Sequence, residues 1–182
     1  MKFETIDSQP IYDGRAFSVR QDRVRLPNGA ESKLDIVEHI GAVTIMPVDS
    51  DGNVWFVRQY RHAIGIEILE LPAGTLEPGE PPEVCAKRET REEIGMGAGK
   101  IQKIGAFYMA PGYSTEFMHV YLATDLYDAP LTGDSDEFLA IERIPIKQIL
   151  SMIQTGKFID GKTLAVFQLA KPYLEEINQE LE

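Results

Sequence analysis

The chain has 182 residues, 43% of them hydrophobic, and a formal net charge of -11 from 29 acidic and 18 basic residues. This length suits one well-filled domain, or a compact domain with an appendage. The acidic balance excludes a basic surface that would attract nucleic acid or an anionic membrane, so we expect neither as a partner. An anionic small-molecule substrate would need local neutralisation by a cation or by a few arginines.

Cysteine content and the N-terminus bear on the compartment. Cys85 is the only cysteine, so no disulfide forms within the chain, which fits a reducing environment. The first ten residues, MKFETIDSQP, lack the apolar core of a signal peptide. No apolar run approaches the roughly 20 residues that a membrane span needs. We therefore expect a soluble, cytoplasmic protein.

The first two thirds of the chain show the patterns of β-strands. Asn28 and Gly29 form a tight-turn signal between two alternating segments, and the sequence DSDGN at residues 49–53 has the same chemistry between the next two. We predict strands over residues 16–26, 31–40, 42–48, 54–60, 66–72, 103–110 and 117–126.

Helical periodicity appears in three places. A helix over residues 82–94 begins with proline and is ended by Gly95. An apolar stripe at i, i+3, i+4 and i+7 marks a second helix over residues 146–156. Asp160 caps a third, which we expect to fray in the acidic tail at residues 174–182. Strands interspersed with a few helices indicate a mixed sheet covered by helices.

Three glutamates gather near the end of the first predicted helix. Glu89, Glu92 and Glu93 are three and four residues apart, so they share one helix face. They also lie near the helix C-terminus, where the helix dipole disfavours negative charge. We expect Ala86, Thr90 and Ile94 to form a buried stripe on a different face. A solvated charged face is one interpretation of the glutamates.

A divalent-cation site is the other interpretation. A glycine-containing loop from Gly74 precedes the helix, and its backbone can approach the face that carries the carboxylates. Oxygen ligands suit magnesium or manganese. His39, His62 and His119 are scattered and have no ligand spacing, so no softer metal is indicated.

Residues 74–96, GTLEPGEPPEVCAKRETREEIGM, resemble the Nudix box. That pattern is Gly, five residues, Glu, seven residues, then Arg-Glu-U-x-Glu-Glu-x-Gly-U, with U aliphatic. Thr90 departs from it, standing where the family has an aliphatic residue. Eight fixed positions over 23 residues make a chance match improbable. The residues in register are Gly74, Glu80, Arg88, Glu89, Glu92, Glu93, Gly95 and Met96.

The resemblance implies the Nudix fold, a mixed β-sheet in an α/β/α sandwich, and hydrolysis of a nucleoside diphosphate linked to another moiety. It implies that Mg²⁺ or Mn²⁺, two or more ions per site, is held by Glu89, Glu92 and Glu93. The carbonyl of Ala73 joins these ligands. Arg88 orients the catalytic glutamates, and Glu80 braces the loop against the helix.

Flanking segments resemble the ADP-ribose pyrophosphatase group. These are RQYR at 58–61, ELPAG at 70–74, PGYSTE at 111–116 and, more weakly, IDGKTLAVF at 159–167. Arginine forks bind phosphate or stack on a base, and a short polar loop can present groups to a sugar. Surface ion pairs and a capped turn are the alternative. The residues implied in substrate binding are Arg58, Arg61, Glu70, Tyr113, Ser114 and Glu116.

A second acidic loop, LTGDSDEFLAIERIP at residues 131–145, lies where this group carries a catalytic glutamate. Glu137 is our candidate for the base that deprotonates the attacking water, with Asp134 and Asp136 as neighbours. The alternative is a plain polar loop.

Three functions remain open from the sequence. The first is metal-dependent hydrolysis of ADP-ribose to AMP and ribose 5-phosphate, or of a related nucleoside diphosphate sugar. The second is hydrolysis of another diphosphate, such as GDP-mannose or a dinucleotide. The third is a non-catalytic nucleotide-ligand sensor. A serine hydrolase is disfavoured because the chain has no G-x-S-x-G motif, and a cysteine hydrolase because Cys85 lies inside a predicted helix with no obvious histidine partner.

We expect residues 1–37 to form an N-terminal β extension with a hairpin that contributes to a homodimer interface. Residues 38–182 then form the Nudix hydrolase domain.

Overall fold

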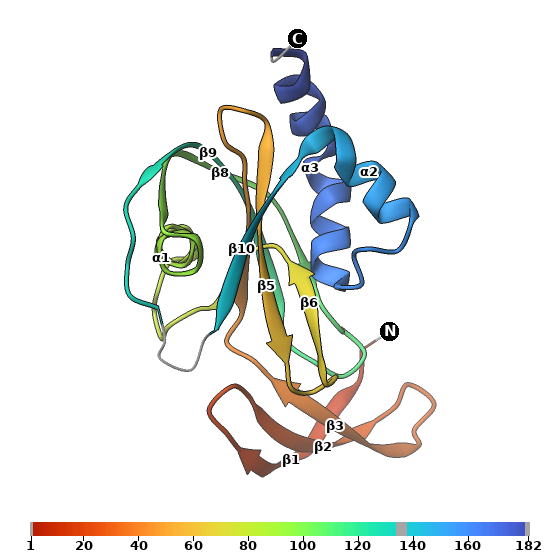
Figure 1. Cartoon of the computed structure of the whole chain (residues 1–182). Helices are drawn as coiled ribbons and strands as arrows, with labels where there is room; N and C mark the ends of the chain where they lie inside the picture. Colours follow the sequence, from red (N-terminus) through yellow and green to blue (C-terminus); the bar gives the residue numbers. More distant parts are fainter. Residues whose placement is uncertain (1, 134–137, 181–182) are drawn as a thin grey trace. The chain divides into compact units, whose positions relative to one another are not determined.

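The structure is a computed structural model that describes residues 2–133 and 138–180. Its contacts divide the chain into two compact units (Figure 1). The first unit comprises Met1–Ala42 and Phe107–Met118, and the second Val43–Ala106 and His119–Glu182. Placing residues 107–118 with the N-terminal segment was not expected from the sequence. No helix in the described part of the chain is long and apolar enough to cross a membrane.

The first unit contains an antiparallel sheet in the order β1-β2-β3. Its strands are β1 (Glu4–Asp13), β2 (Ser18–Arg25) and β3 (Glu31–Glu38). The predicted hairpin is confirmed: Arg25 pairs with Glu31, and Gly29 takes the positive φ of 85° that the tight turn needs. Strand β1 was missed. It contains Pro10 and is almost wholly exposed, so it lacks the alternation that marks a strand.

The second unit holds most residues of the remaining strands. These strands are β4 (Ala42–Pro47), β5 (Asn53–Arg61), β6 (Ile66–Glu70), β7 (Ala73–Thr75), β8 (Met96–Tyr108), β9 (Phe117–Asp128) and β10 (Leu139–Pro145). Three of them, β4, β8 and β9, also include residues of the first unit. Their hydrogen bonds give the strand orders β10-β5-β6 and β7-β4-β9-β8.

Two differences from the sequence-based strands have simple causes. Strand β8 begins at Met96, well before residue 103, because its first half, MGAGKIQ, has glycines and a lysine in place of an alternating pattern. Strand β10 was predicted as loop. Its sequence, LAIERIP, is short and carries two charges. It becomes a strand because it pairs with β5, with Leu139 opposite Gln59 at one end and Pro145 opposite Asn53 at the other.

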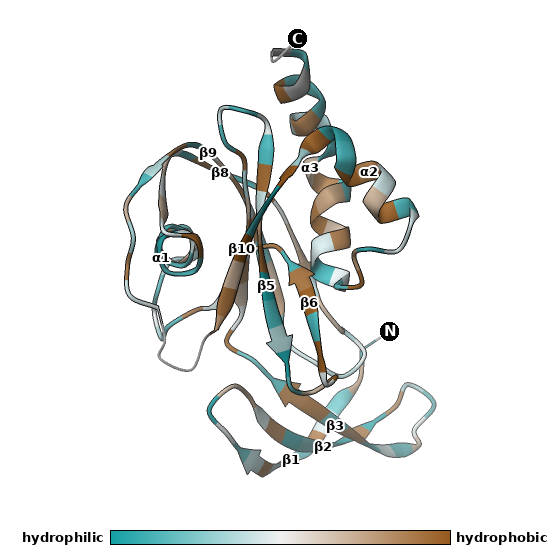
Figure 2. Cartoon of the chain, in the orientation of Figure 1, coloured by the Kyte–Doolittle hydropathy of each residue, from teal (hydrophilic) through white to brown (hydrophobic). Residues whose placement is uncertain are grey.

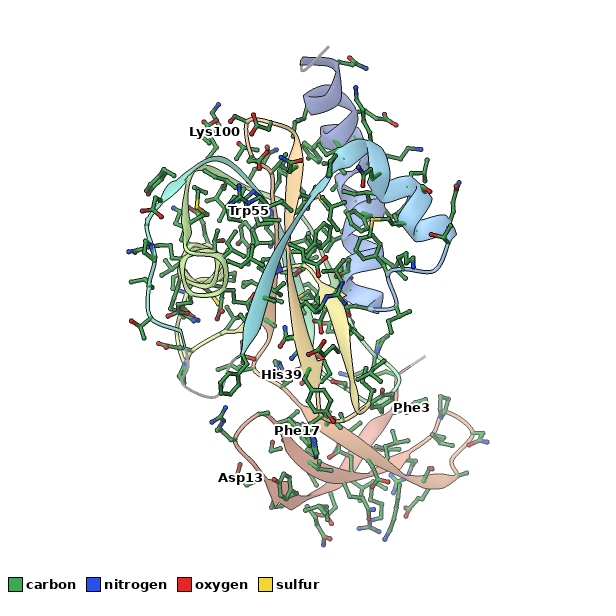
Figure 3. All side chains as sticks on the ribbon, in the orientation of Figure 1. Phe3, Asp13, Phe17, His39, Trp55 and Lys100 are labelled. Carbon is green, nitrogen blue, oxygen red and sulfur yellow. The ribbon has the colours of Figure 1, made fainter. Side chains whose placement is uncertain are left out.

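Helix α1 (Pro82–Ile94) covers one face of the sheet. Cys85 and Ala86 pack with Val43, Ile45 and other core residues of β4 and β9. Ile94 joins a second cluster with Trp55 and Val57 of β5. Figure 3 labels Trp55 among the packed side chains of this unit.

Helix α3 (Gly161–Glu180) covers the opposite face, and α2 (Ile146–Gln154) packs against it (Figure 1). Phe56 points away from its β5 neighbours Trp55 and Val57. Its ring lies 5.2 Å from that of Phe158 and 6.0 Å from that of Phe167 of α3. The predicted α/β/α sandwich is therefore confirmed.

The three helices lie where the sequence placed them. Gly95 ends α1 with a φ of 73°, and Gly156 follows α2 with a φ of 69°. Asp160 caps α3 by accepting the N–H of Thr163 at 3.0 Å. Helix α3 continues past Pro172 to Glu180, and the last two residues of the tail that was expected to fray lie outside the described residues.

Candidate active site

Helix α1 brings the charged residues together at the surface of the second unit. Figure 2 colours much of it as hydrophilic. The predicted stripe of Ala86, Thr90 and Ile94 is buried, and the Thr90 hydroxyl donates to the carbonyl of Ala86 at 2.7 Å, so the polar side chain is satisfied. Glu89 and Glu93 are also buried, at 7% and 6% exposure. These two carboxylates therefore border the core, and a fully solvated face is excluded.

Arg88 lies at the centre of the carboxylates. Its Nη1 donates to Oε1 of Glu89 at 2.6 Å and to Oε2 of Glu92 at 2.8 Å. Its Nε and Nη2 each lie 3.0 Å from an oxygen of Glu80. Hydrogen bonding to Glu80 is the first cause of a raised Arg88 pKa, and the same bond lowers the pKa of Glu80 to about 2. One guanidinium thus offsets the repulsion among three acids.

The loop before α1 meets the same helix face. Glu93 accepts the N–H of Ala73 at 3.0 Å. At Gly74 the backbone comes so close that an added Cβ would lie 1.8 Å from Oε1 of Glu89. A side chain at this position would have to displace the Glu89 carboxylate. The Ala73–Gly74 backbone therefore lies against the two buried carboxylates.

The chemistry of these groups fits a hard divalent cation. Carboxylate and carbonyl oxygens are the ligands that Mg²⁺ and Mn²⁺ prefer, and the close approach at Gly74 sets the loop against the acids. Over residues 2–133 and 138–180, no three Asp, Glu, His or Cys side chains already converge as a metal cluster. Arg88 and the Ala73 N–H hold the carboxylates instead. A bound cation would compete with Arg88 for these oxygens.

The two arginines of β5 have different partners. Arg58 Nε donates to Glu142 of β10 at 2.5 Å, and both side chains are partly exposed. Arg61 makes a two-point contact with Glu70, through Nε at 2.6 Å and Nη2 at 2.8 Å. Glu70 raises the pKa of Arg61, and the charge of Glu93 adds to this effect. Arg61 therefore lies within electrostatic reach of the carboxylate cluster.

Glu70 is less accessible than the sequence suggested. It is 1% exposed, and besides Arg61 it contacts Nζ of Lys162 at the start of α3. Both carboxylate oxygens thus already have cationic partners.

Comparison with known proteins decides the family. The family model described as NUDIX domain matches residues 38–167, which is well over half of the chain. The chain belongs to the Nudix family. A second model, described as the nucleoside diphosphate sugar hydrolase N-terminal domain, matches residues 3–33. The predicted family is confirmed.

Relatives cover nearly the whole Nudix chain. It is 38% identical to the ADP-ribose pyrophosphatase of Bacillus subtilis, over 91% of this chain and 90% of that one. It is 39% identical to the ADP-ribose pyrophosphatase of Mycobacterium tuberculosis, over 90% of this chain and 80% of that one. A crystal structure of an ADP compounds hydrolase superposes with a TM-score of 0.87 at 25% identity, covering 100% of this chain and 98% of that chain.

The predicted sugar-binding loop belongs to the first unit of this Nudix protein. Tyr113 is largely exposed, and Ser114 Oγ accepts the N–H of Glu116 at 3.1 Å. The N–H of Val37 in β3 donates to the Tyr113 carbonyl at 2.8 Å. A hollow of about 430 Å³ adjoins this loop. It is lined by Tyr108, Pro111, Ser114, Thr115 and Phe117.

The predicted base, Glu137, and its two acidic neighbours, Asp134 and Asp136, are not among the described residues. The role of Glu137 stays a prediction from the sequence.

Sequence reasoning assigned no role to Lys162 or Glu142. Lys162 is 7% exposed and joins Glu70 to Asp160, and Glu142 pairs with Arg58. The weak resemblance at residues 159–167 contained Lys162, and the Asp160 cap located it in the first turn of a helix. No local signal predicts its partner, because Glu70 is 92 residues away.

Proposed function

We propose that this protein hydrolyses the pyrophosphate bond of ADP-ribose to give AMP and ribose 5-phosphate. The observation that carries the proposal is the complete set of Nudix-box carboxylates, gathered around Arg88 and against the Ala73–Gly74 backbone. The relatives named ADP-ribose pyrophosphatase support the choice of substrate. Nudix hydrolases generally require a divalent metal, and we propose Mg²⁺ or Mn²⁺, with two or more ions in the site.

We assign the proposed ligands to Glu89, Glu92, Glu93 and the Ala73 carbonyl. Bound cations would neutralise the diphosphate and increase the acidity of the attacking water. Glu93 keeps its place by accepting the Ala73 N–H. Arg88 orients Glu89 and Glu92. Glu80, which holds the other edge of the guanidinium, braces the loop.

The remaining residues would bind substrate or move the proton. Arg58 is partly exposed and pairs with the partly exposed carboxylate of Glu142, so it is suited to a phosphate. Arg61 is held in place by its two hydrogen bonds to Glu70. The proposed role of Glu70 is therefore to orient the Arg61 guanidinium for substrate. Glu137 is the proposed base. The ring of Tyr113, the hydroxyl of Ser114 and the carboxylate of Glu116 are the proposed sugar contacts.

We also propose a homodimer in which the first unit supplies the interface. Supporting this, the unit exposes several large apolar side chains, two of which Figure 3 labels. They are Phe3, Ile11, Tyr12, Phe17 and Ile40. Light scattering on the full chain should give twice the monomer mass, and Ile11→Glu should halve it. A monomeric wild-type chain would contradict this proposal.

The activity is tested with purified protein, Mg²⁺ or Mn²⁺, and a panel of ADP-ribose, ADP-glucose, GDP-mannose, UDP-glucose and dinucleotides. Selective release of AMP from ADP-ribose supports the proposal. Faster turnover of another member of the panel keeps the chemistry but replaces the substrate. Binding without turnover under either metal would indicate a sensor.

Glu93→Gln ties that activity to α1. The amide oxygen can still accept the Ala73 N–H, so the fold should persist while the negative charge is lost. Turnover should fall by at least about 100-fold. The matched control is Glu83→Gln on the same helix, since Glu83 is exposed and pairs with Lys87 at the surface. Full activity in Glu93→Gln would remove this helix from the reaction.

A further inference from the structure

A largely buried group of charges connects the start of α3 to the end of β6, and the Arg61 side chain, which is 43% exposed, extends it to the surface. Lys162 Nζ contacts Oε2 of Glu70 and lies 2.8 Å from Oδ2 of Asp160. Arg61 contacts both oxygens of the same Glu70. The four side chains carry two positive and two negative charges, so the group is neutral. Buried charges are stable only in such paired, hydrogen-bonded arrangements.

Thr163 extends this group to the backbone. Its hydroxyl donates to Oδ2 of Asp160 at 2.6 Å, and its oxygen accepts the N–H of Leu71 at 3.0 Å. The same Asp160 oxygen accepts the Thr163 N–H and therefore caps α3. Asp160 thus fixes the direction of the Thr163 hydroxyl, and a lone pair is left facing Leu71. Thr163 is fully buried, so no water competes for this bond.

The segment from Glu70 to Ala73 is held at every residue. Glu70 binds Arg61 and Lys162, and the Leu71 N–H binds Thr163. The Pro72 carbonyl accepts the N–H of Ile45 at 2.8 Å. The Ala73 N–H then donates to Glu93. Since Pro72 also has a fixed φ, the segment has little freedom, and the position of its last carbonyl depends on α3 together with β4 and α1.

We propose that Thr163, Asp160 and Lys162 are positioning residues of the metal centre, which hold residues 70–73 so that the Ala73 carbonyl faces the cation site. The proposal rests on the proposed function, because it concerns the metal ligands assigned there. It adds a role for α3, which contributes no ligand. Outer partners that orient metal ligands commonly change metal affinity by about 10- to 100-fold when they are removed.

A purely structural role for these residues makes a different prediction. If Thr163 only stabilised α3, its loss would lower the melting temperature, and the protein that remained folded would bind metal normally. Metal affinity measured well below the melting temperature therefore separates the two roles. It needs no substrate, so it is independent of which diphosphate the enzyme cleaves.

The test compares wild type with Thr163→Val, which keeps the shape of the side chain but cannot accept the Leu71 N–H. Mn²⁺ binding to the full chain is titrated by electron paramagnetic resonance. We expect Thr163→Val to weaken Mn²⁺ binding by about 10- to 100-fold. Thr163→Ser, which restores the hydroxyl, should return the affinity to within about threefold of wild type.

Thr44→Val is the matched control. Thr44 is another fully buried threonine of the second unit, and its hydroxyl has no hydrogen-bond partner in the part of the chain that the structure describes. Its replacement should leave Mn²⁺ affinity unchanged. Activity assays add a second measurement: at saturating Mn²⁺, Thr163→Val should recover most of its kcat, because excess metal compensates for weak binding.

The outcomes distinguish a failure of the positioning role from a failure of the proposed metal centre. If wild type binds Mn²⁺ and Thr163→Val binds it within about threefold, the positioning role is wrong while the metal centre stands. If wild type binds no Mn²⁺, the metal centre itself is wrong and the positioning role falls with it. Should Thr163→Val not fold, Asp160→Asn takes its place. It keeps the helix cap but loses the charge that orients Lys162, and unchanged affinity in that variant would likewise overturn the proposal.

Discussion

Arg88 and Glu80 form a two-point ion pair, with Nε 3.0 Å from Oε1 and Nη2 3.0 Å from Oε2. The pair joins the middle of α1 to the loop that precedes it, and the N–H of Glu77 adds a further bond to the same carboxylate at 3.0 Å. Three donors favour the ionised form, which is why the pKa of Glu80 falls to about 2 from an ordinary value of 4.5. The brace is therefore electrostatic and depends on pH.

Glu80→Gln should lower the free energy of unfolding by about 1–3 kcal/mol at neutral pH, because it replaces a bond between charges with a weaker one. The folded pKa is depressed, so the contribution of Glu80 is complete above about pH 4.5 and is lost as the pH falls towards 2. Urea unfolding at pH 7, 5, 4 and 3.5 measures this. The gap between wild type and variant should narrow below pH 4.5, and a gap that stays constant would contradict the ionic brace.

Gly74→Ala should impair metal binding more than folding. Its Cβ would lie 1.8 Å from Oε1 of Glu89, so the carboxylate must move away from the loop. We expect Mn²⁺ affinity and kcat to fall by at least about tenfold, with a stability loss of about 1 kcal/mol. Gly161→Ala is the control, because an added Cβ there meets nothing within 4 Å. Equal Mn²⁺ affinity in Gly74→Ala and wild type would show that Glu89 is not needed where the structure places it.

Arg58 and Glu142 provide a paired test of phosphate binding. If Arg58 binds the diphosphate, Arg58→Gln should raise KM by about tenfold or more with little change in kcat, since the interaction is made in both ground and transition states. Glu142→Gln removes the competing carboxylate at 2.5 Å and should leave KM equal or lower. Steady-state kinetics of both variants decides this. A similar rise in KM for both would indicate that the pair matters only as a structural link between β5 and β10.

Local sequence signals predicted much of the fold, including the helix that carries Glu89, Glu92 and Glu93. The proline start and glycine end of α1 are short-range features, and so its bounds, Pro82 and Ile94, are those that the sequence predicts. The same holds for the spacing of Glu89, Glu92 and Glu93. Strand β1 and strand β10 were missed because pairing with β2 and β5, and not their own alternation, makes them strands.

The ion pairs that Glu70 makes in the candidate site could not be predicted from the sequence either. Glu70 was expected to face a ligand, but it is buried by Arg61 and by Lys162 of a helix 92 residues away. Neither Glu70 nor Lys162 carries a local mark of that contact. Spacing within one helix fixes which side chains share a face, whereas the partner of a buried charge depends on how separate elements pack.

Glu137→Gln tests the base that the sequence assigns outside the described residues. A general base acts in the chemical step, so its loss should lower kcat by about 100- to 10,000-fold with little effect on KM or on Mn²⁺ affinity. Asp134→Asn and Asp136→Asn are the matched comparisons in the same loop, and each should keep most of the activity. The pH profile of kcat adds a second criterion: the acidic limb should disappear in Glu137→Gln if that limb reports the base. A raised KM with unchanged kcat would instead make Glu137 a substrate contact, and a dominant loss in Asp134→Asn or Asp136→Asn would move the base to that residue.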